Sequence, residues 1–302
     1  MTRNNPACTL CPRHCRKPRT RDTGEGVCHM PVQPVLARAA LHHWEEPPVS
    51  GTEGAGTVFF SGCALRCVYC QNYAISQENF GAVVTPVRLR EIFQELIQAG
   101  AHTIDLVNPT HFAPAILEAL AEPLPVPLVW NSGGYDTVET LRSLAGKVDI
   151  YLPDFKYPDG EGAARYSAAG DYPQVAQAAI QEMVRQTGPY LLDQDGLLRR
   201  GVLIRHLILP GRVKQAKAVM DWIAQTFPPH TVLVSLMSQY VPLGRAADFP
   251  EINRPLRASE HRAAANYFAA LGLEGYTQDL SAAEAGFVPS FQLEGVLPSK
   301  KF

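Results

Sequence analysis

The chain has 302 residues, of which 46% are hydrophobic, so it is long enough for one large α/β domain and a small appendage. Its formal net charge of -2 gives no whole-chain argument for binding nucleic acid or a membrane surface. The sequence contains no run of about 18 apolar residues and no signal-peptide pattern. We therefore expect a soluble cytoplasmic protein that has no membrane partner.

The first 50 residues contain little regular pattern but four of the seven cysteines. Four thiols spaced C-x2-C-x3-C-x12-C suit a structural metal knuckle, and a segment without its own core gains its fold from the metal. Zinc and an additional 4Fe-4S cluster both remain open, and buried free thiols are the simpler alternative. The four residues are Cys8, Cys11, Cys15 and Cys28.

The same segment is basic, because no acidic residue precedes Asp22. A basic run of this kind either binds an anionic partner or is a solvated face, and the solvated face is the more common case. The basic residues are Arg3, Arg13, Arg16, Lys17, Arg19 and Arg21. A Pro-rich stretch, residues 45–56, then favours a linker, so we predict a cysteine-rich segment with its linker at 1–50 and the main domain at 51–302.

The main domain alternates short apolar runs with segments of helical periodicity. Six strands are predicted at 57–62, 103–109, 126–134, 148–157, 201–211 and 231–242. Six helices are predicted at 87–100, 112–121, 137–146, 173–188, 214–227 and 258–272, and an irregular tail follows the last. This alternation predicts parallel strands joined by right-handed crossovers. Because six units are too few for an eight-stranded barrel, we predict a partial (β/α)6 barrel.

Functional groups of parallel α/β folds lie at the carboxyl ends of the strands, and those ends are polar here. Polar residues are ordinary in any single loop. Because the strands themselves are almost entirely apolar, ordinary loop polarity does not explain why all of the strand ends carry polar residues. The residues at these ends include Asn108, Asn131, Ser132, Asp154, Lys156 and Arg205.

The first predicted strand leads directly into a loop that contains Cys63, Cys67 and Cys70, spaced C-x3-C-x2-C. Cysteine thiolates hold iron–sulfur clusters, and three thiols in one loop suit such a cluster. Three ligands leave one iron of a 4Fe-4S cluster without a protein ligand. An open coordination site of this kind is where chemistry can occur.

This cysteine loop resembles the signature of the radical S-adenosylmethionine (radical SAM) superfamily. The resemblance implies a 4Fe-4S cluster on the three cysteines, with S-adenosylmethionine (AdoMet) chelated to the open iron. One electron from the cluster would cleave AdoMet, and the resulting 5′-deoxyadenosyl radical would abstract a hydrogen atom from a substrate.

AdoMet must then be held at its methionine and ribose ends. Asn108, Asn131 and Ser132 are candidates for the amino and ribose groups. Lys156 is a candidate for the carboxylate, with Asp154 on the same strand face.

Two further residues are candidates for the AdoMet site. Tyr69, just before the third cysteine, either lies along the adenine or packs within the loop. Arg205 needs an anion if it points into the barrel, which makes it a candidate for the AdoMet site as well.

From residue 8 to about residue 278, the chain resembles the homologues of pyruvate formate-lyase activating enzyme. The shared segments include SGCALRCVYCQNY, WNSGGY, YLPDFKY and GVLIRHLILPG. The resemblance implies an oxidoreductase with an external electron donor such as flavodoxin or ferredoxin, which activates a glycyl-radical enzyme or modifies a protein or peptide. The Asp154-x-Lys156 pair resembles the activases' AdoMet-binding motif, whereas Asn108-Pro109-Thr110 replaces their Gly-Gly-Glu-type motif.

A second hypothesis is a metal-binding module that recognises nucleic acid through the amino-terminal knuckle and its basic residues. A binding module has no need of six polar strand ends around a three-cysteine loop. We therefore do not expect a nucleic-acid partner. A plain electron-transfer protein is less favoured still, since it normally has four ligands for each cluster and no ligand-binding barrel.

Overall fold

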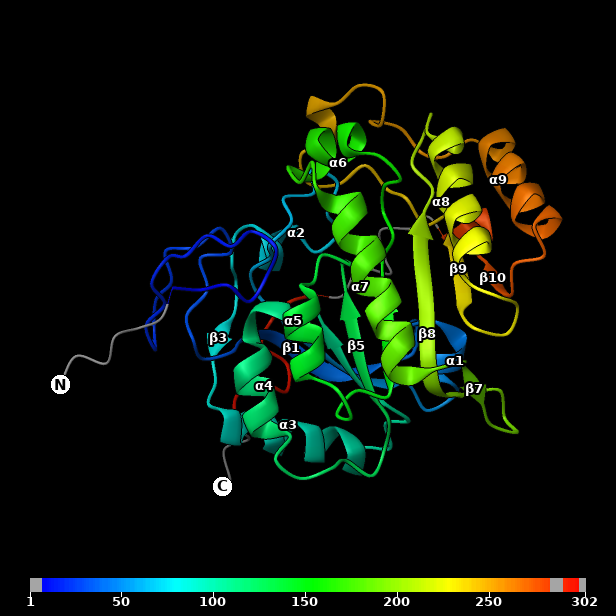
Figure 1. Ribbon diagram of the computed structural model, residues 1–302. Coiled ribbons are helices and arrows are strands. Elements are labelled where there is room, and N and C mark those ends of the chain that lie inside the picture. Colours follow the sequence, from blue (N-terminus) through cyan, green and yellow to red (C-terminus); the bar gives the residue numbers. More distant parts are fainter. Residues whose placement is uncertain (1–6, 283–289, 299–302) are drawn as a thin grey trace.

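The structure, a computed structural model, describes residues 7–282 and 290–298 (Figure 1). Its centre is a mixed β-sheet. The described strands are β1 (Val35–His42), β2 (Ala55–Phe60), β3 (Ala82–Val83), β4 (Ile104–Val107), β5 (Leu128–Ser132), β6 (Ile150–Pro153), β7 (Leu191–Leu192), β8 (Leu198–Leu207), β9 (Leu233–Met237) and β10 (Gly275–Thr277). Across the sheet they follow the order β10-β9-β8-β6-β5-β4-β2-β1-β3, and β7 pairs with β8.

The six predicted strands are confirmed as β2, β4, β5, β6, β8 and β9, and each pairs in parallel with its neighbour. Within the described residues the sheet does not close, because β10 and β3 form its two edges. The predicted partial (β/α)6 barrel is therefore confirmed.

The helices pack mainly on the outer face of this sheet (Figure 1). The described helices are α1 (Pro47–Ser50), α2 (Tyr73–Ser76), α3 (Pro86–Gln98), α4 (Ala113–Ala119), α5 (Val138–Ser143), α6 (Gly160–Ser167), α7 (Tyr172–Thr187), α8 (Val213–Thr226) and α9 (Ala258–Ala270). The six predicted helices are α3, α4, α5, α7, α8 and α9. Local signals mark where a helix begins and ends, as α3 shows. At its start, the Thr85 side chain accepts a hydrogen bond from the backbone N–H of Arg88. Gly100, with a φ of +99°, follows the end of the helix.

The stretch before the barrel is more ordered than the sequence predicts. Strand β1 pairs antiparallel with β2, although we expected no regular structure there. The expected linker contains α1, whose Val49 is fully buried against the inner face of the barrel. Both elements gain their order from long-range burial, which local patterns do not report. The division of the chain at residue 50 stays a prediction.

The inner face of the barrel has apolar side chains at its floor and polar side chains at its mouth, near the carboxyl ends of the strands. On three neighbouring strands an apolar residue in the inner cluster is followed two positions later by a polar residue that lines a cavity. Residues two apart in a strand share a face, so the apolar residues fill the floor and the polar ones reach the mouth. The pairs are Val129 and Asn131 on β5, Leu152 and Asp154 on and just after β6, and Leu203 and Arg205 on β8.

None of the described helices is long and apolar enough to cross a membrane.

Candidate functional site

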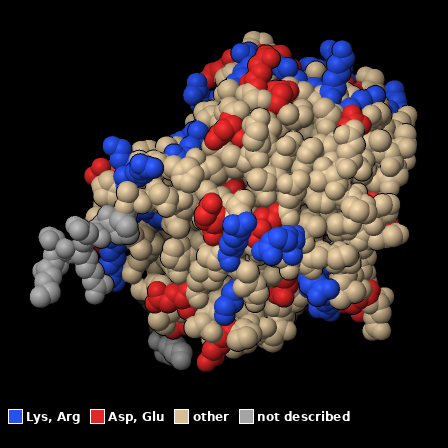
Figure 2. Space-filling model, in the orientation of Figure 1, with Lys and Arg blue, Asp and Glu red and all other residues tan. Residues whose placement is uncertain are grey.

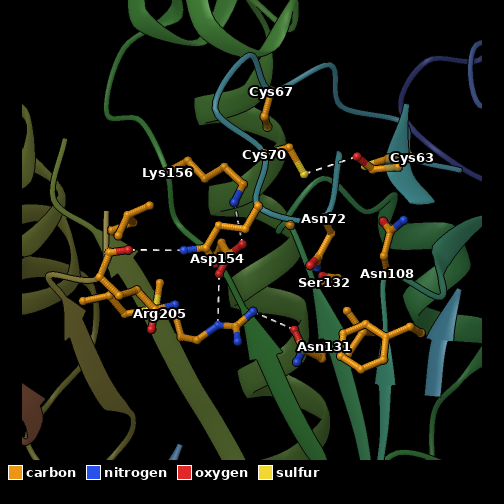
Figure 3. A pocket seen from close by; sticks show the side chains of 18 of the residues that line it. Cys63, Cys67, Cys70, Asn72, Asn108, Asn131, Ser132, Asp154, Lys156 and Arg205 are labelled. Atoms are coloured by element: carbon orange, nitrogen blue, oxygen red, sulfur yellow. Dashed lines mark hydrogen bonds and ion pairs between the residues drawn. The ribbon is translucent and has the colours of Figure 1, made fainter. Parts of the chain in front are cut away.

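One cavity of about 510 Å³ lies at the carboxyl ends of the parallel strands (Figure 3). It brings together all ten residues that the sequence predicts for the iron–sulfur and AdoMet sites. They are Cys63, Cys67, Tyr69, Cys70, Asn108, Asn131, Ser132, Asp154, Lys156 and Arg205. In the view of Figure 3 the three cysteines lie toward one side of the cavity, and Asn131 and Arg205 lie toward the other.

The cysteine loop places a hydrogen-bonding group beside each of its three sulfurs. The backbone N–H of Leu65 donates to Cys63 Sγ over 3.4 Å, and the Ser76 hydroxyl donates to Cys70 Sγ over 3.2 Å. The third sulfur, Cys67 Sγ, lies 3.0 Å from the Ser167 hydroxyl. Hydrogen bonds to ligand sulfurs are one means by which proteins set the reduction potential of an iron–sulfur cluster.

The burial of the thiols tests whether this donor set fits a cluster. Burial raises the pKa of Cys70 to about 11 and also raises the pKa of Cys63, and the neighbouring thiols add to both shifts. Thiolates at these three positions, one buried and two half-buried, therefore need a cationic partner, and iron supplies the positive charge. No three His, Cys, Asp or Glu side chains in the described ranges converge closely enough for a single metal ion. A four-iron cluster does not require such convergence, because each thiolate binds a different iron.

The Ser167 hydroxyl belongs to a buried series of hydrogen bonds that starts at a residue in the cavity wall. Tyr69 Oη lies 2.7 Å from Tyr157 Oη, which lies 2.7 Å from Ser167 Oγ. Burial raises the pKa of both tyrosines well above the usual value, so both remain protonated near neutral pH. This series of hydrogen bonds thus connects Tyr69, which lines the cavity, to the sulfur of Cys67.

Opposite the cysteines, Arg205 is the centre of a buried ionic network. Its Nε lies 3.0 Å from Asp154 Oδ1, and its Nη1 lies 3.1 Å from Glu45 Oε1. Asp154 also binds Lys156 Nζ through its second oxygen, over 2.5 Å. Burial alone would raise the pKa of Asp154, but the two cations reverse the shift and hold the pKa below its usual value. Asp154 is therefore a carboxylate at neutral pH.

The asparagine and serine at the neighbouring strand ends already have partners inside the protein. Asn131 accepts from Arg205 Nη2 over 2.6 Å and donates to Glu45 over 3.2 Å. Ser132 donates to Asp136 over 2.5 Å. Both side chains line the cavity, and both also hold neighbouring acidic or basic groups in place.

Comparison with known proteins adds three findings to this geometry. The family described as "4Fe-4S single cluster domain" matches residues 49–152, which include the cysteine loop. An uncharacterized protein of Methanocaldococcus jannaschii, MJ0674, is 30% identical over 263 residues, or 84% of this chain and 71% of that protein.

Two crystal structures of Streptococcus suis SuiB have similar folds, one bound to its precursor peptide SuiA and one bound to S-adenosylmethionine. Both have a TM-score of 0.50, at 11% and 10% identity, and both match 74% of this chain. The match spans about half of each SuiB chain, 48% and 50%.

The chain belongs to the radical SAM superfamily. It is also a member of the family of the M. jannaschii protein. The expected fold and the expected 4Fe-4S cluster class are confirmed by the SuiB structures and by the family model, respectively.

Three polar residues of the radical SAM site were missed by sequence reasoning. Glu45 lies in the expected linker, and only the fold brings it to Arg205. Ser167 ends a helix that was not predicted. Asp105 is fully buried in β4, where burial raises its pKa well above the usual value. A carboxylate within an otherwise apolar predicted strand was a signal that could have identified Asp105.

The amino-terminal cysteines lie outside the radical SAM cavity. Cys11 and Cys28 are buried, and Cys8 and Cys15 are half-buried. Their assignment as a second metal site stays a prediction from the sequence.

The basic residues of this segment do not form one free cationic surface. Arg19 is buried and donates to the carbonyl oxygens of Met30 and His111 over 3.0 and 2.7 Å. Arg13 also binds backbone carbonyls, and Arg3 lies outside the described residues. Figure 2 shows acidic and basic side chains mixed over one face of the molecule. The expectation that nucleic acid is not a partner stays a prediction.

Proposed function

We propose that this radical SAM enzyme cleaves AdoMet reductively at a 4Fe-4S cluster held by Cys63, Cys67 and Cys70, and that its substrate is a protein or peptide. The observation that supports the first part is the single cavity that joins the three thiols to the predicted AdoMet residues. The bound cluster and AdoMet would supply a 5′-deoxyadenosyl radical for hydrogen abstraction. The protein binds and orients both groups and excludes water.

Asn108 is our proposed acceptor for the AdoMet amino group. Its side-chain amide N–H donates to the Gly62 carbonyl oxygen, which orients the amide group. Within the described structure its Oδ1 accepts no hydrogen bond, so this oxygen can face an ammonium group. The residue has a φ of +60°, a conformation that asparagine tolerates better than most residues. Asn108 could thus replace the acidic residue of the activases' Gly-Gly-Glu-type motif.

Lys156 and Tyr69 are our proposed partners for other parts of AdoMet. Lys156 Nζ binds only one carboxylate oxygen of Asp154, and an ammonium has three donors, so it can also bind the AdoMet carboxylate. Tyr69 presents an aromatic wall whose orientation is fixed by its hydrogen bond to Tyr157. Apolar side chains complete the lining and exclude water from the radical. They include Phe59, Leu65, Ile75, Val107, Leu207 and Met237.

The polar character of the rest of the cavity supports a peptide substrate. Lys156 and Arg205, the Lys and Arg residues of the lining, are both paired with carboxylates, which disfavours a phosphate-rich substrate. Gln239 and Gln278 line the cavity and are linked by a 3.2 Å hydrogen bond between their side chains. Side-chain amides can both donate to and accept from peptide groups. The substrates covered by this proposal include the glycine of a glycyl-radical enzyme.

The first experiment measures 5′-deoxyadenosine from anaerobically reconstituted protein with AdoMet and dithionite. We expect the wild-type chain to form it and the Cys63→Ser/Cys67→Ser/Cys70→Ser variant to form none. Replacement of dithionite by reduced flavodoxin or ferredoxin tests the proposed class of electron donor. Cluster-loaded wild-type protein that yields no 5′-deoxyadenosine with dithionite would contradict the proposal.

A second experiment tests the substrate class. Cells grown in D2O supply a deuterated peptide fraction and a deuterated small-molecule fraction, and mass spectrometry detects deuterium in 5′-deoxyadenosine. We expect transfer from the peptide fraction. Transfer from the small-molecule fraction alone would overturn the assignment of a peptide substrate and leave AdoMet cleavage intact.

A further inference from the structure

Within the described residues the sheet has two edges, and only one of them borders the cavity. The edges are β3 and β10, which lie on opposite sides of the view in Figure 1. Gln278 directly follows the last residue of β10, Thr277, and lines the cavity together with Ser281. Neither residue of β3 lines it. The unpaired backbone groups of an edge strand are a template for another extended chain.

The backbone of β10 has hydrogen-bonding groups on its outer side. On the inner side, the Gln278 N–H donates to the Leu236 carbonyl oxygen of β9, and the Glu274 carbonyl oxygen accepts from an N–H of the same strand. Because backbone groups alternate in direction along a strand, those of Gly275 and Thr277 point away from β9. Both residues are exposed, and no described strand pairs with them on that side.

The cavity wall beside this edge has an amide donor that can bind a ligand. The Gln278 side chain is held at both ends, since its Oε1 accepts from the Ser238 N–H over 3.1 Å and its Nε2 donates to Gln239 Oε1 over 3.2 Å. Gln239 lines the cavity, and its Nε2 donates to no group in the parts of the chain that the structure describes. This nitrogen can therefore donate to a carbonyl oxygen of a peptide that passes the wall.

We propose that the peptide substrate binds as an extra strand along the outer side of β10 and enters the cavity past Gln278. This assignment rests on the proposed function, in which the substrate is a protein or peptide. The N–H and C=O groups of Gly275 and Thr277 pair with the main chain of the substrate. The Nε2 of Gln239 binds a carbonyl oxygen further along the same segment.

Strand geometry connects this edge to the cavity. Because β10 is parallel to β9, its carboxyl end also lies at the mouth of the barrel, and a strand advances about 3.3 Å per residue. A substrate residue one or two positions beyond its pairing with Thr277 therefore lies beside Gln278. Main-chain pairing supplies affinity for any extended segment, and the cavity then selects the side chain. We expect target residues in flexible or terminal segments of the substrate.

The test replaces Thr277 by proline, which removes its outward N–H and places a ring in the path of the added strand. Proline is tolerated on an edge strand where the N–H does not pair within the sheet. The readout is the deuterium transferred to each 5′-deoxyadenosine formed, measured with the peptide fraction from cells grown in D2O. We expect Thr277→Pro to lower this ratio by about tenfold, the order of effect of one lost hydrogen bond.

Val83→Pro is the matched control, because it makes the same change on the other edge. Val83 is exposed, and the N–H of the next residue, Val84, donates to the Pro34 carbonyl oxygen on the β1 side. The N–H of Val83 therefore points away from β1, and this variant should keep the wild-type ratio. Equal ratios in the two proline variants would overturn the pairing of the substrate with β10.

Gln239→Leu gives a second measure that leaves the backbone of β10 unchanged. This variant should also lower the ratio, and a wild-type ratio would contradict the proposed path into the cavity. The competing occupant of the edge is a second copy of this chain. A dimer in size-exclusion chromatography that Thr277→Pro converts to a monomer, with the wild-type ratio kept, would identify that occupant and overturn the proposal.

Failure of the proposed function has a different signature. Cluster-loaded wild-type protein that forms no 5′-deoxyadenosine would contradict AdoMet cleavage itself. Deuterium transfer from the small-molecule fraction alone would contradict the peptide class of substrate. Both results come from the wild-type chain, whereas the pairing with β10 is decided by the variants.

Discussion

The sulfur of Cys67 lies 3.0 Å from the hydroxyl oxygen of Ser167, a residue 100 positions later in the chain. A thiolate that binds iron has no proton, so Ser167 must be the donor in this hydrogen bond. Ser167 then accepts from Tyr157, and Tyr157 accepts from Tyr69. Cluster binding would therefore align three buried hydroxyl groups toward one ligand sulfur, and aligned chains strengthen each of their hydrogen bonds.

The first prediction concerns the cluster potential. Ser167→Ala should make the reduction potential more negative, because a hydrogen bond to a thiolate stabilises the reduced cluster more than the oxidised one. A redox titration followed by electron paramagnetic resonance measures the shift. Ser167→Thr keeps the hydroxyl and serves as the control, and Tyr157→Phe should give a smaller shift in the same direction. Identical potentials for the alanine and threonine variants would rule out this role.

The second prediction concerns the buried ionic network. Arg205→Met should lower the free energy of unfolding by about 3–5 kcal/mol, because it leaves Asp154 and Glu45 buried without their main cation. Urea unfolding measures this change. Arg38→Met is the matched control: the Arg38 side chain is equally buried, at 14% exposure, but its partner Glu294 is 59% exposed. That change should cost less than about 1 kcal/mol, and equal losses for the two variants would contradict the prediction.

The third prediction concerns pH. Burial, together with the neighbouring charge of Glu45, raises the pKa of Glu46 to about 7 in the folded protein. Between the ordinary pKa of a glutamate and about 7 the folded state retains a proton that the unfolded state has lost, so this group destabilises the fold as pH rises. Glu46→Gln should therefore stabilise the protein relative to wild type by more at pH 8 than at pH 4, by up to about 3 kcal/mol.

The measurement for Glu46 is the free energy of unfolding of both proteins at the two pH values. A difference between wild type and variant that stays constant with pH would show that Glu46 does not titrate in this range. The contribution of Asp154 to the free energy of unfolding changes with pH in the opposite direction, because its pKa is lowered in the folded protein. Its contribution is present above the unfolded pKa of an aspartate and is lost as the pH falls through the lower folded value.

The fourth prediction concerns AdoMet binding. Asn108→Ala removes the proposed acceptor for the amino group and should weaken AdoMet binding to the cluster-loaded protein by about tenfold or more. Equilibrium dialysis measures the affinity. Asn79→Ala is the matched control, because Asn79 has a similar φ of +61° but does not line the cavity. Equal affinities for the two variants would remove Asn108 from the AdoMet site.

Much of the cavity could be predicted from the sequence because its residues follow the ends of strongly patterned strands. Successive residues of a strand point to opposite faces, so Arg205 and His206 of β8 have opposite facings. The structure places Arg205 in the cavity, whereas His206 binds the carbonyl oxygen of Phe155 over 2.7 Å. Asp154 and Lys156 likewise share a strand end, and a direct hydrogen bond joins them. In each case the two residues are only one or two positions apart, so strand geometry alone predicts whether their side chains share a face.

The cysteine spacing, the six parallel strands and the polar strand ends can be read from the sequence alone, because each depends on neighbours in the chain. The pairing of Glu45 with Arg205, 160 positions away, and the contact of Ser167 with Cys67 depend on the folded arrangement. It also decided that β1 extends the sheet and that Arg13 joins the amino-terminal segment to the cysteine loop. Contacts across such separations depend on how whole elements pack, and no local periodicity records that packing.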